Sequence, residues 1–254
     1  AAQGYPDAYV RPVAWRGSEM MGVSAQETSI NVAIAVWEWP SYFSPEARMH
    51  GIRLKTSKWR RPDPQTAPVH AKAAGLYMIC TLSKHEAEAD GWDDALMLDW
   101  RGQVAESTGA NIFLVQDGKI HTPTPDCFLD GITRRTVIEL ARAHNIDVVE
   151  RVIMPEEFEK TDEVFVTGTA AEVTPVGQVD DYNFQVGSVT RTLMEDYDAL
   201  VRGVALDVDW GAFAEPACSE KMKDSSETTP LSGAPTFFSA AKALGRATEN
   251  SLKR

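Results

Sequence analysis

The sequence is poor in cysteine and lacks paired metal-binding motifs. Its 254 residues contain three cysteines, Cys80, Cys127 and Cys218, which lie far apart and are odd in number. This pattern argues against a disulfide framework and favours a reducing compartment, so we predict a cytoplasmic location. The five histidines show no metal-ligand spacing, and neither C-x-x-C nor H-E-x-x-H occurs. We therefore expect no resident metal ion.

Positive charge and long apolar runs are also scarce. Lysine and arginine number 25 against 37 acidic residues, which gives a formal net charge of −12. Without a basic stripe, a nucleic-acid partner is not expected. No apolar stretch approaches the roughly 20 residues that cross a bilayer, and the N-terminus lacks a signal-peptide pattern, so no membrane partner is expected. The composition, 43% hydrophobic and 24% charged, is that of a globular protein with one or two domains.

Short apolar runs predict a β-rich middle. An Asp117-Gly118 pair between two such runs predicts a hairpin. The earliest apolar run in the chain, Asn31–Trp37, is nearly continuous and suits a strand covered on both faces. The predicted strands are Asn31–Trp37, Asp94–Asp99, Ile112–Val115, Lys119–Thr122, Asn145–Glu150 and Asp162–Thr167.

Three helices are predicted between these strands, so the fold class is mixed α/β. The first follows the loop Asp63–Pro68, carries Lys72 and aligns apolar side chains on one side. The second follows Gly131, with Asp130 as a plausible N-cap. Its apolar side follows the spacing i, i+4, i+7 and i+8, at Thr133, Val137, Leu140 and Ala141. The third covers residues Val189–Val201.

Breaks in the pattern divide the chain. The stretch from Trp39 to Pro45, rich in proline and serine, indicates a linker at residues 40–44 between residues 1–39 and 45–203. Residues 204–254 form a polar tail, and Ser219–Pro235 has the composition of a disordered segment.

Lys72 lies among small and apolar residues, in the run Pro68–Tyr77. Burial there would disfavour the charged ammonium, and a neutral amine can attack a carbonyl carbon to form an imine. The alternative is a lysine whose stem packs on apolar surface while its head reaches water, which is the commoner fate of lysine.

Other parts of the chain provide what pyridoxal chemistry requires beyond a lysine: an acid for the pyridine nitrogen, a phosphate cradle and a carboxylate site. Glu106, followed by small residues, is the candidate acid, with a solvated turn carboxylate as the alternative. Gly131–Arg134 opens a predicted helix, and Gly168–Ala171 follows a predicted strand; both are candidate anion sites. Nucleotide motifs of the G-x-x-x-x-G-K-[ST] or G-x-G-x-x-G type are absent.

Four blocks, in this order, resemble the class IV pyridoxal-phosphate aminotransferases, and most closely the branched-chain-amino-acid aminotransferases. They are Val69–Tyr77, Ala105–Phe113, Gly131–Arg134 and Gly168–Val176. The resemblance covers roughly Ala8 to Gly203. It implies a larger α/β domain at 45–203 with mixed sheet, a remnant of the small N-terminal domain at 1–39, and a homodimer.

The resemblance also implies roles for individual residues. Lys72 would form the imine with pyridoxal 5′-phosphate and move the substrate α-proton, Tyr77 would hydrogen-bond the cofactor phenolate oxygen, and Glu106 would pair with the pyridine nitrogen. The implied cofactor-binding residues are Lys72, Tyr77, Glu106, Leu129, Ile132, Thr133 and Thr169. The implied substrate-binding residues are Tyr9, Arg11, Trp39, Tyr42, Thr169 and Ala170.

The implied reaction is ping-pong transfer of an amino group from leucine, isoleucine or valine to 2-oxoglutarate, in branched-chain amino-acid biosynthesis. An apolar pocket with Tyr9 and Arg11 at its edge could accept both a branched side chain and glutamate. A D-amino-acid transaminase, an aminodeoxychorismate lyase and an inactive fragment that associates with a partner chain are the alternatives. In the family, a segment before the block that matches Tyr9–Arg11 builds most of the small domain. We expect it to be truncated, lost or a separate chain.

Overall fold

The computed structural model describes residues 4–5, 8–39 and 45–203. The chain divides into two compact units, Ala1–Asp209 and Trp210–Arg254, and the second lies wholly outside the described residues. The predictions of a linker at 40–44, of a role for Tyr42 and of a disordered tail also fall outside them. Among the described residues, no helix is both long and apolar enough to cross a membrane.

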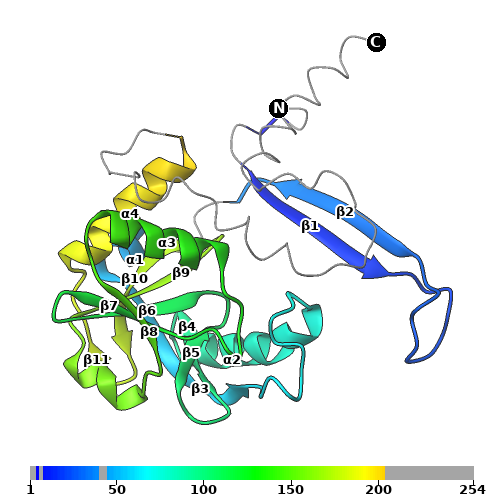
Figure 1. Cartoon of the computed structure of the whole chain (residues 1–254), viewed down its shortest axis with the longest axis horizontal. Coiled ribbons are helices and arrows are strands. Elements are labelled where there is room, and N and C mark those ends of the chain that lie inside the picture. The colour runs from blue at the N-terminus through cyan, green and yellow to red at the C-terminus, as the bar shows by residue number, and fades with distance from the viewer. Residues whose placement is uncertain (1–3, 6–7, 40–44, 204–254) are drawn as a thin grey trace, which may run out of the picture. The chain divides into compact units, whose positions relative to one another are not determined.

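The N-terminal part is an antiparallel hairpin of β1 (Tyr9–Arg16) and β2 (Ile30–Trp37), paired from Tyr9↔Trp37 to Arg16↔Ile30 (Figure 1). The predicted strand is confirmed, but the expected cover on both of its faces is wrong for the described residues. Val32 and Ile34 are 67% and 62% exposed. The reason is that a two-stranded ribbon pairs backbone groups without burying either face.

Residues 45–203 follow β1 and β2 and contain the remaining elements. Its helices are α1 (Pro45–His50), α2 (Met78–Ala89), α3 (Ile132–Ala143) and α4 (Ser188–Val201), with short 3₁₀ helices η1 (Ala74–Tyr77) and η2 (Pro155–Lys160). Its strands are β3 (Ile52–Arg61), β4 (Asp94–Asp99), β5 (Val104–Ser107), β6 (Asn111–Gln116), β7 (Lys119–Pro123), β8 (Val148–Arg151), β9 (Glu163–Gly168), β10 (Glu172–Val179) and β11 (Tyr182–Asn183).

Strand pairing within residues 45–203 closes on itself. The strands β3, β4, β5, β6, β9 and β10 pair in that order, and β10 returns to β3. β7 and β8 extend the sheet from β6, and β11 extends it from β10. Aliphatic side chains from alternate positions form the main core, among them Leu54, Leu96, Ile112, Val164 and Val176. Side chains at the positions between them face the other side of the sheet.

The three longer helices, α2, α3 and α4, pack on the sheet outside this core (Figure 1). α2 contacts β3 and β4, while α3 contacts β9 and α4, and α4 contacts β10. The predicted hairpin is confirmed by the pairing of β6 with β7, with Asp117 and Gly118 at φ values of +50° and +74°. The strand predicted from Asn145 begins later, at Val148, because Asn145 adopts a left-handed conformation (φ +58°) just after α3.

Two details of the helix predictions are wrong. Lys72 lies in a loop ahead of η1, because backbone bonds from Ala71 to Pro68 and from Ala73 to Ala71 close tight turns there. Asp130 does not cap α3. The N-cap is Gly131, without a side-chain bond, and the Asp130 carboxylate instead accepts a hydrogen bond from the buried Arg134 at 2.9 Å.

Candidate active site

Lys72 and Tyr77 come together at the turn before α2. The Lys72 Nζ donates a hydrogen bond to the Tyr77 hydroxyl at 3.0 Å and lies 5.5 Å from the centre of that ring. The expected burial of Lys72 is not found in the described chain: its side chain is exposed, because the alanines beside it are too small to cover it. The amine is therefore accessible to a molecule that enters from solvent.

A β-bulge determines where Glu106 points. Met97 pairs with Glu106 and Leu98 pairs with Val104, which leaves Ala105 as an extra residue in β5. A bulge shifts the alternation of side chains by one position. Glu106 therefore shares the helix-covered face with Met97 and with Asn111, its partner on β6. The alternative of a solvated turn carboxylate is wrong, since Glu106 lies in a strand and is buried.

Burial makes Glu106 an unusual acid. Desolvation raises the pKa of its carboxyl to about 7, although the positive charges of Arg61 and Lys72 act to lower it. Arg61, also buried, places its Nε 3.4 Å from Glu106 Oε1. On the other oxygen, Asn111 Nδ2 donates to Glu106 Oε2 at 3.4 Å. The carboxyl therefore exchanges its proton near neutral pH.

The first turn of α3 offers uncapped backbone N–H groups. Its N-cap, Gly131, is extended (ψ 144°) and makes no side-chain capping bond. Helix N-termini of this kind attract anions through free N–H groups and the positive end of the helix dipole. Thr133 is buried there, with its hydroxyl 3.3 Å from that of Tyr197, whereas Ile132 is exposed. The carbonyl of Leu129, just before the turn, accepts a bond from Asn111 Nδ2 at 2.9 Å.

The second candidate anion site is the turn between β9 and β10. Thr169 is exposed in it, and Ala170 is half-buried. Gly168 brings this turn against the backbone of the turn between β5 and β6, because a Cβ built on it would lie 3.2 Å from the Gly109 carbonyl oxygen. The turn therefore adjoins the segment between Glu106 and Asn111.

In the hairpin, three aromatic rings and one guanidinium form a cluster. Tyr9 lies 5.1 Å from Trp37 and 5.0 Å from Trp39, measured between ring centroids. The Arg11 guanidinium carbon lies 5.6 Å from the Tyr9 ring centre. The structure thus brings Tyr9, Arg11 and Trp39 together. Sequence reasoning missed Trp37. It could have been found from the pairing of the two strands, which places Trp37 directly across from Tyr9.

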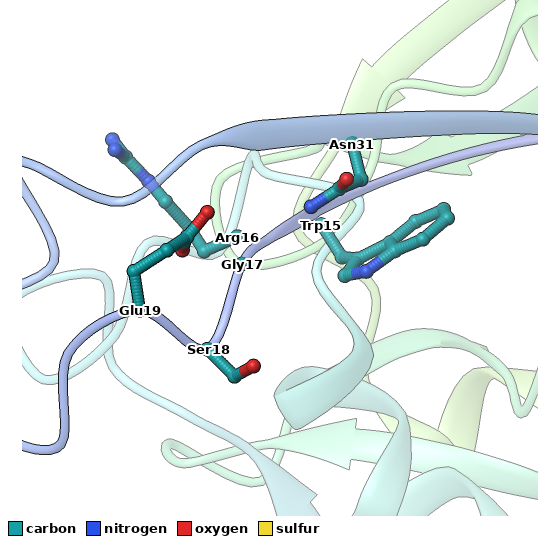
Figure 2. Close-up of a pocket in the computed structure, with 6 residues that line it drawn as sticks. All are labelled: Trp15, Arg16, Gly17, Ser18, Glu19 and Asn31. Atoms are coloured by element: carbon teal, nitrogen blue, oxygen red, sulfur yellow. The ribbon is translucent and has the colours of Figure 1, made fainter.

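An open pocket lies at the far end of the same hairpin. Figure 2 shows the residues that line it: Trp15, Arg16, Gly17, Ser18, Glu19 and Asn31. Its charged groups already have partners within the hairpin. Arg16 donates to the Ala25 carbonyl at 2.7 Å, and Glu19 accepts from the Ser29 backbone at 3.3 Å. Both charged side chains of the pocket are therefore engaged within the hairpin itself.

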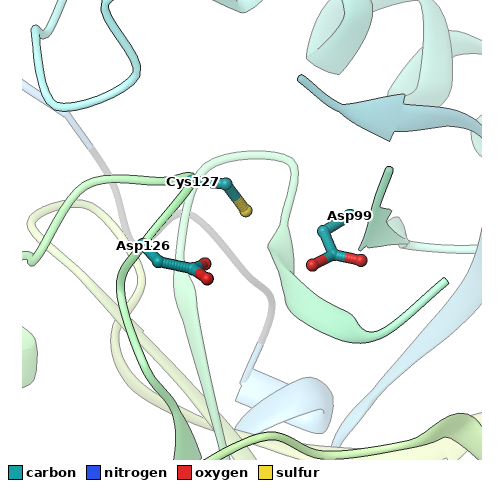
Figure 3. A group of neighbouring side chains, drawn as sticks. All are labelled: Asp99, Asp126 and Cys127. Carbon is teal, nitrogen blue, oxygen red and sulfur yellow. The ribbon is translucent and has the colours of Figure 1, made fainter. Parts of the chain in front are cut away.

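Asp99, Asp126 and Cys127 gather at one place with the spacing of metal ligands (Figure 3). A cation of the protein already lies between the two carboxylates, since Arg101 Nη2 is 2.6 Å from an oxygen of each. Burial also raises the pKa of the Cys127 thiol to about 12, and a protonated thiol is a poor metal ligand. The cluster ties the end of β4 to the loop before α3.

Two residues that sequence reasoning missed complete the surroundings of Glu106. Arg61 lies at the end of β3, and its Nη1 donates to the Leu76 carbonyl at 3.3 Å and to the Cys80 sulfur at 3.4 Å. Asn111 lies within one of the four family-like blocks, but the resemblance implied no role for it. No local pattern marks either residue, because both act through contacts between separate strands.

A family model described as amino-transferase class IV matches residues 1–179. The branched-chain-amino-acid aminotransferase of Pseudomonas aeruginosa is 42% identical over 199 residues, which are 77% of this chain and 65% of that protein. The Escherichia coli enzyme of the same name is 38% identical over 209 residues, 80% of this chain and 67% of that protein. The chain thus spans about 65% of the length of the first of these relatives.

Solved structures show the same likeness. The branched-chain aminotransferase of Thermoproteus uzoniensis with norvaline aligns with a TM-score of 0.75 at 37% identity, over 80% of this chain and 67% of that one. The T.th. enzyme complexed with N-(5′-phosphopyridoxyl)-L-glutamate aligns with a TM-score of 0.75 at 39% identity, over 80% and 67%. With a family model over most of its length and these relatives, the chain belongs to the class IV aminotransferases and is most like the branched-chain aminotransferases among them.

Proposed function

We propose that the protein is a pyridoxal-phosphate-dependent transaminase that transfers an amino group from leucine, isoleucine or valine to 2-oxoglutarate by a ping-pong mechanism. The observation that carries the proposal is one site that holds an accessible lysine amine, the Tyr77 hydroxyl 3.0 Å from it and a buried carboxyl, Glu106. The names of the relatives support the reaction and the substrates. A homodimer and a cytoplasmic location stay predictions.

The residues present fit the cofactor. Glu106 is a buried acid whose pKa, about 7, suits a proton shared with an aromatic nitrogen. The uncapped first turn of α3, through Ile132 and Thr133, suits a phosphate, and the Thr169 hydroxyl is accessible for the same purpose. Leu129 would pack on the ring. When bound, pyridoxal phosphate supplies an electrophilic carbon and an electron-accepting ring.

Each residue then has a defined part in moving protons. The Lys72 Nζ would remove the proton from the substrate α-carbon as a general base and deliver it to the C4′ carbon of the cofactor as a general acid. Tyr77 holds that amine in place through its hydroxyl. Glu106 would hold the proton on the ring nitrogen, which needs an ionised carboxylate, and the nearby Arg61 favours that ionised form.

Substrate recognition is assigned to the aromatic cluster and to the β9–β10 turn. Tyr9 and Trp39 offer an apolar surface for a branched side chain, and Arg11 beside them offers a cation for the side-chain carboxylate of glutamate. Tyr42 is proposed for the same pocket. Thr169 and Ala170 would bind the substrate carboxylate. Two similar structures were solved with norvaline and with a glutamate adduct, which supports one substrate with an apolar side chain and one with an acidic side chain.

A visible spectrum before and after borohydride tests the proposal. The wild-type protein with pyridoxal phosphate should show a band that borohydride removes, and Lys72→Ala should lack it. Lys119→Ala, which changes a surface lysine paired with Asp147, is the matched control and should keep the band. A band that survives Lys72→Ala would show that another amine carries the chemistry. No band in the wild type would favour the inactive fragment instead.

Amino donors then decide between reactions of the same fold. Leucine, isoleucine, valine, D-alanine and aminodeoxychorismate should be offered separately with 2-oxoglutarate. We expect the three branched-chain L-amino acids to react fastest. Preference for D-alanine, or release of product from aminodeoxychorismate, would overturn the substrate assignment and leave the cofactor assignment in place.

A further inference from the structure

Asn111 contacts two of the proposed cofactor-binding residues and the glycine that opens the anion-binding turn of α3. Its Nδ2 donates to Glu106 Oε2 at 3.4 Å and to the Leu129 carbonyl at 2.9 Å. On its other side, its Oδ1 lies where a Cβ on Gly131 would come within 2.4 Å. Asn111 is 5% exposed, so these contacts are made without competition from bulk water.

The contacts lie on separate elements. Glu106 belongs to β5, Asn111 begins β6, and Leu129 lies in the loop that leads into α3. The ion pairs that this loop makes with Arg101 and Arg134 do not involve Glu106. Among the described residues, the amide of Asn111 thus links the Glu106 carboxyl to the loop before α3 through hydrogen bonds.

We propose that Asn111 is a positioning residue that couples Glu106 to the start of α3, so that the acid and the anion-binding turn hold one fixed geometry. The inference rests on the proposed function, because it assigns those two groups to one cofactor. It also gives a reason for glycine at residue 131: a Cβ there would lie 2.4 Å from Asn111 Oδ1, so the amide or the turn would have to shift.

The coupling acts on an acid that several charges face. Arg61 from β3 and Lys72 from the loop before η1 favour the ionised carboxyl. The ionised carboxyl in turn helps to raise the pKa of two buried thiols, Cys80 on α2 and Cys127 in the loop before α3. Asn111 adds no charge, only a donor. Displacing it removes a hydrogen bond from the ionised form and so favours the neutral form.

The decisive experiment uses Gly131→Ala, which does not touch Glu106. The protonation of Glu106 is measured without cofactor, by infrared spectroscopy of protein labelled with ¹³C in its glutamate side chains, with Glu106→Gln to identify the band. Gly131→Ala should raise the pKa of Glu106 by about 0.5 to 1 pH unit, as loss of one hydrogen bond does. Gly75→Ala is the control, because a Cβ there meets no atom within 4 Å.

Direct substitution supports the same test. Asn111→Asp should raise the pKa of Glu106 further than Gly131→Ala, since it adds a like charge, and Asn111→Ala covers the case in which Asn111→Asp does not fold. Asn183→Ala, an exposed asparagine on β11, should change nothing. Each variant that moves this pKa should also weaken binding of pyridoxal phosphate by about tenfold or more, measured from its absorbance.

Two results would overturn the inference. One is a folded Gly131→Ala protein in which Glu106 titrates as in the wild type. The other is an Asn111→Ala protein that loses thermal stability while the Glu106 pKa and cofactor binding stay unchanged, which is what a purely structural role predicts. Failure of the wild type to bind pyridoxal phosphate would instead refute the proposed function, and the infrared result would still decide the coupling.

Discussion

Replacing Arg61 with methionine should protonate Glu106 at neutral pH. Methionine has a similar reach and fills the buried volume, but it removes the positive charge 3.4 Å from Glu106 Oε1. Two unit charges at that distance interact by roughly 4 to 5 kcal/mol if the effective dielectric constant is about 20. Carboxyls beside an arginine are shifted by roughly 1 to 3 pH units in practice, because desolvation of the arginine offsets part of the attraction.

We therefore expect the pKa of Glu106, about 7 in the wild type, to rise in Arg61→Met. A rise of about 2 pH units would leave the carboxyl almost fully neutral at pH 7.5. A neutral acid no longer stabilises a proton on the ring nitrogen. The rate constant kcat should therefore fall by roughly 10- to 100-fold, with a smaller change in KM, and fall less at high pH, where Glu106 ionises again.

The assay has two parts. Infrared spectra of ¹³C-glutamate-labelled protein without cofactor give the Glu106 pKa, and kcat for leucine is measured as a function of pH. Arg61→Lys is the control, because it keeps the charge while losing the forked geometry that reaches Leu76 and Cys80. If Arg61→Met folded and Glu106 still titrated near 7, the electrostatic reasoning would be wrong. An equal loss in Arg61→Lys would point to geometry rather than charge.

Three further outcomes are expected. Glu106→Gln should stabilise the cofactor-free protein by up to about 3 kcal/mol at pH 8 and by much less at pH 5, in urea unfolding followed by circular dichroism. Gly118→Ala should lower stability by about 1 kcal/mol in the same assay, because φ is +74° there; no loss would contradict the turn geometry. Arg11→Gln should raise the KM for 2-oxoglutarate more than the KM for leucine, and equal effects on both would remove Arg11 from the proposed role.

Local sequence was sufficient for several parts of the fold and site. The Asp117-Gly118 turn, the strand Asp94–Asp99 and the closing helix follow from local pattern and are confirmed. The turn Gly131–Arg134 could be placed at a helix start for the same reason. Glycine turns and apolar periodicity act over a few positions, so a single sequence displays them directly.

Other parts depend on pairing between distant segments. Whether Glu106 faces the core or the helices is decided by one extra residue, Ala105, which only the register with β4 reveals. Arg61 and Asn111 reach Glu106 from β3 and β6, and Trp37 reaches Tyr9 across the hairpin. The position of Lys72 ahead of its helix follows from tight turns that alanine-rich sequence does not predict.

Glu106 is better explained by chemistry than by stability. Its pKa is raised in the folded chain, from 4.5 to about 7, so the folded state binds the proton more tightly than the unfolded state. Between these two values stability falls as pH rises, by about 3 kcal/mol in total at 1.36 kcal/mol per pH unit, and that cost is complete above pH 7. A buried ion pair with Arg61 does not remove it, and apolar residues of the same volume would often be more stable. The ionised acid is therefore maintained at a cost in stability, by a cation on one oxygen and an amide on the other. Such an arrangement is typical of a group that must exchange or hold a proton near neutral pH.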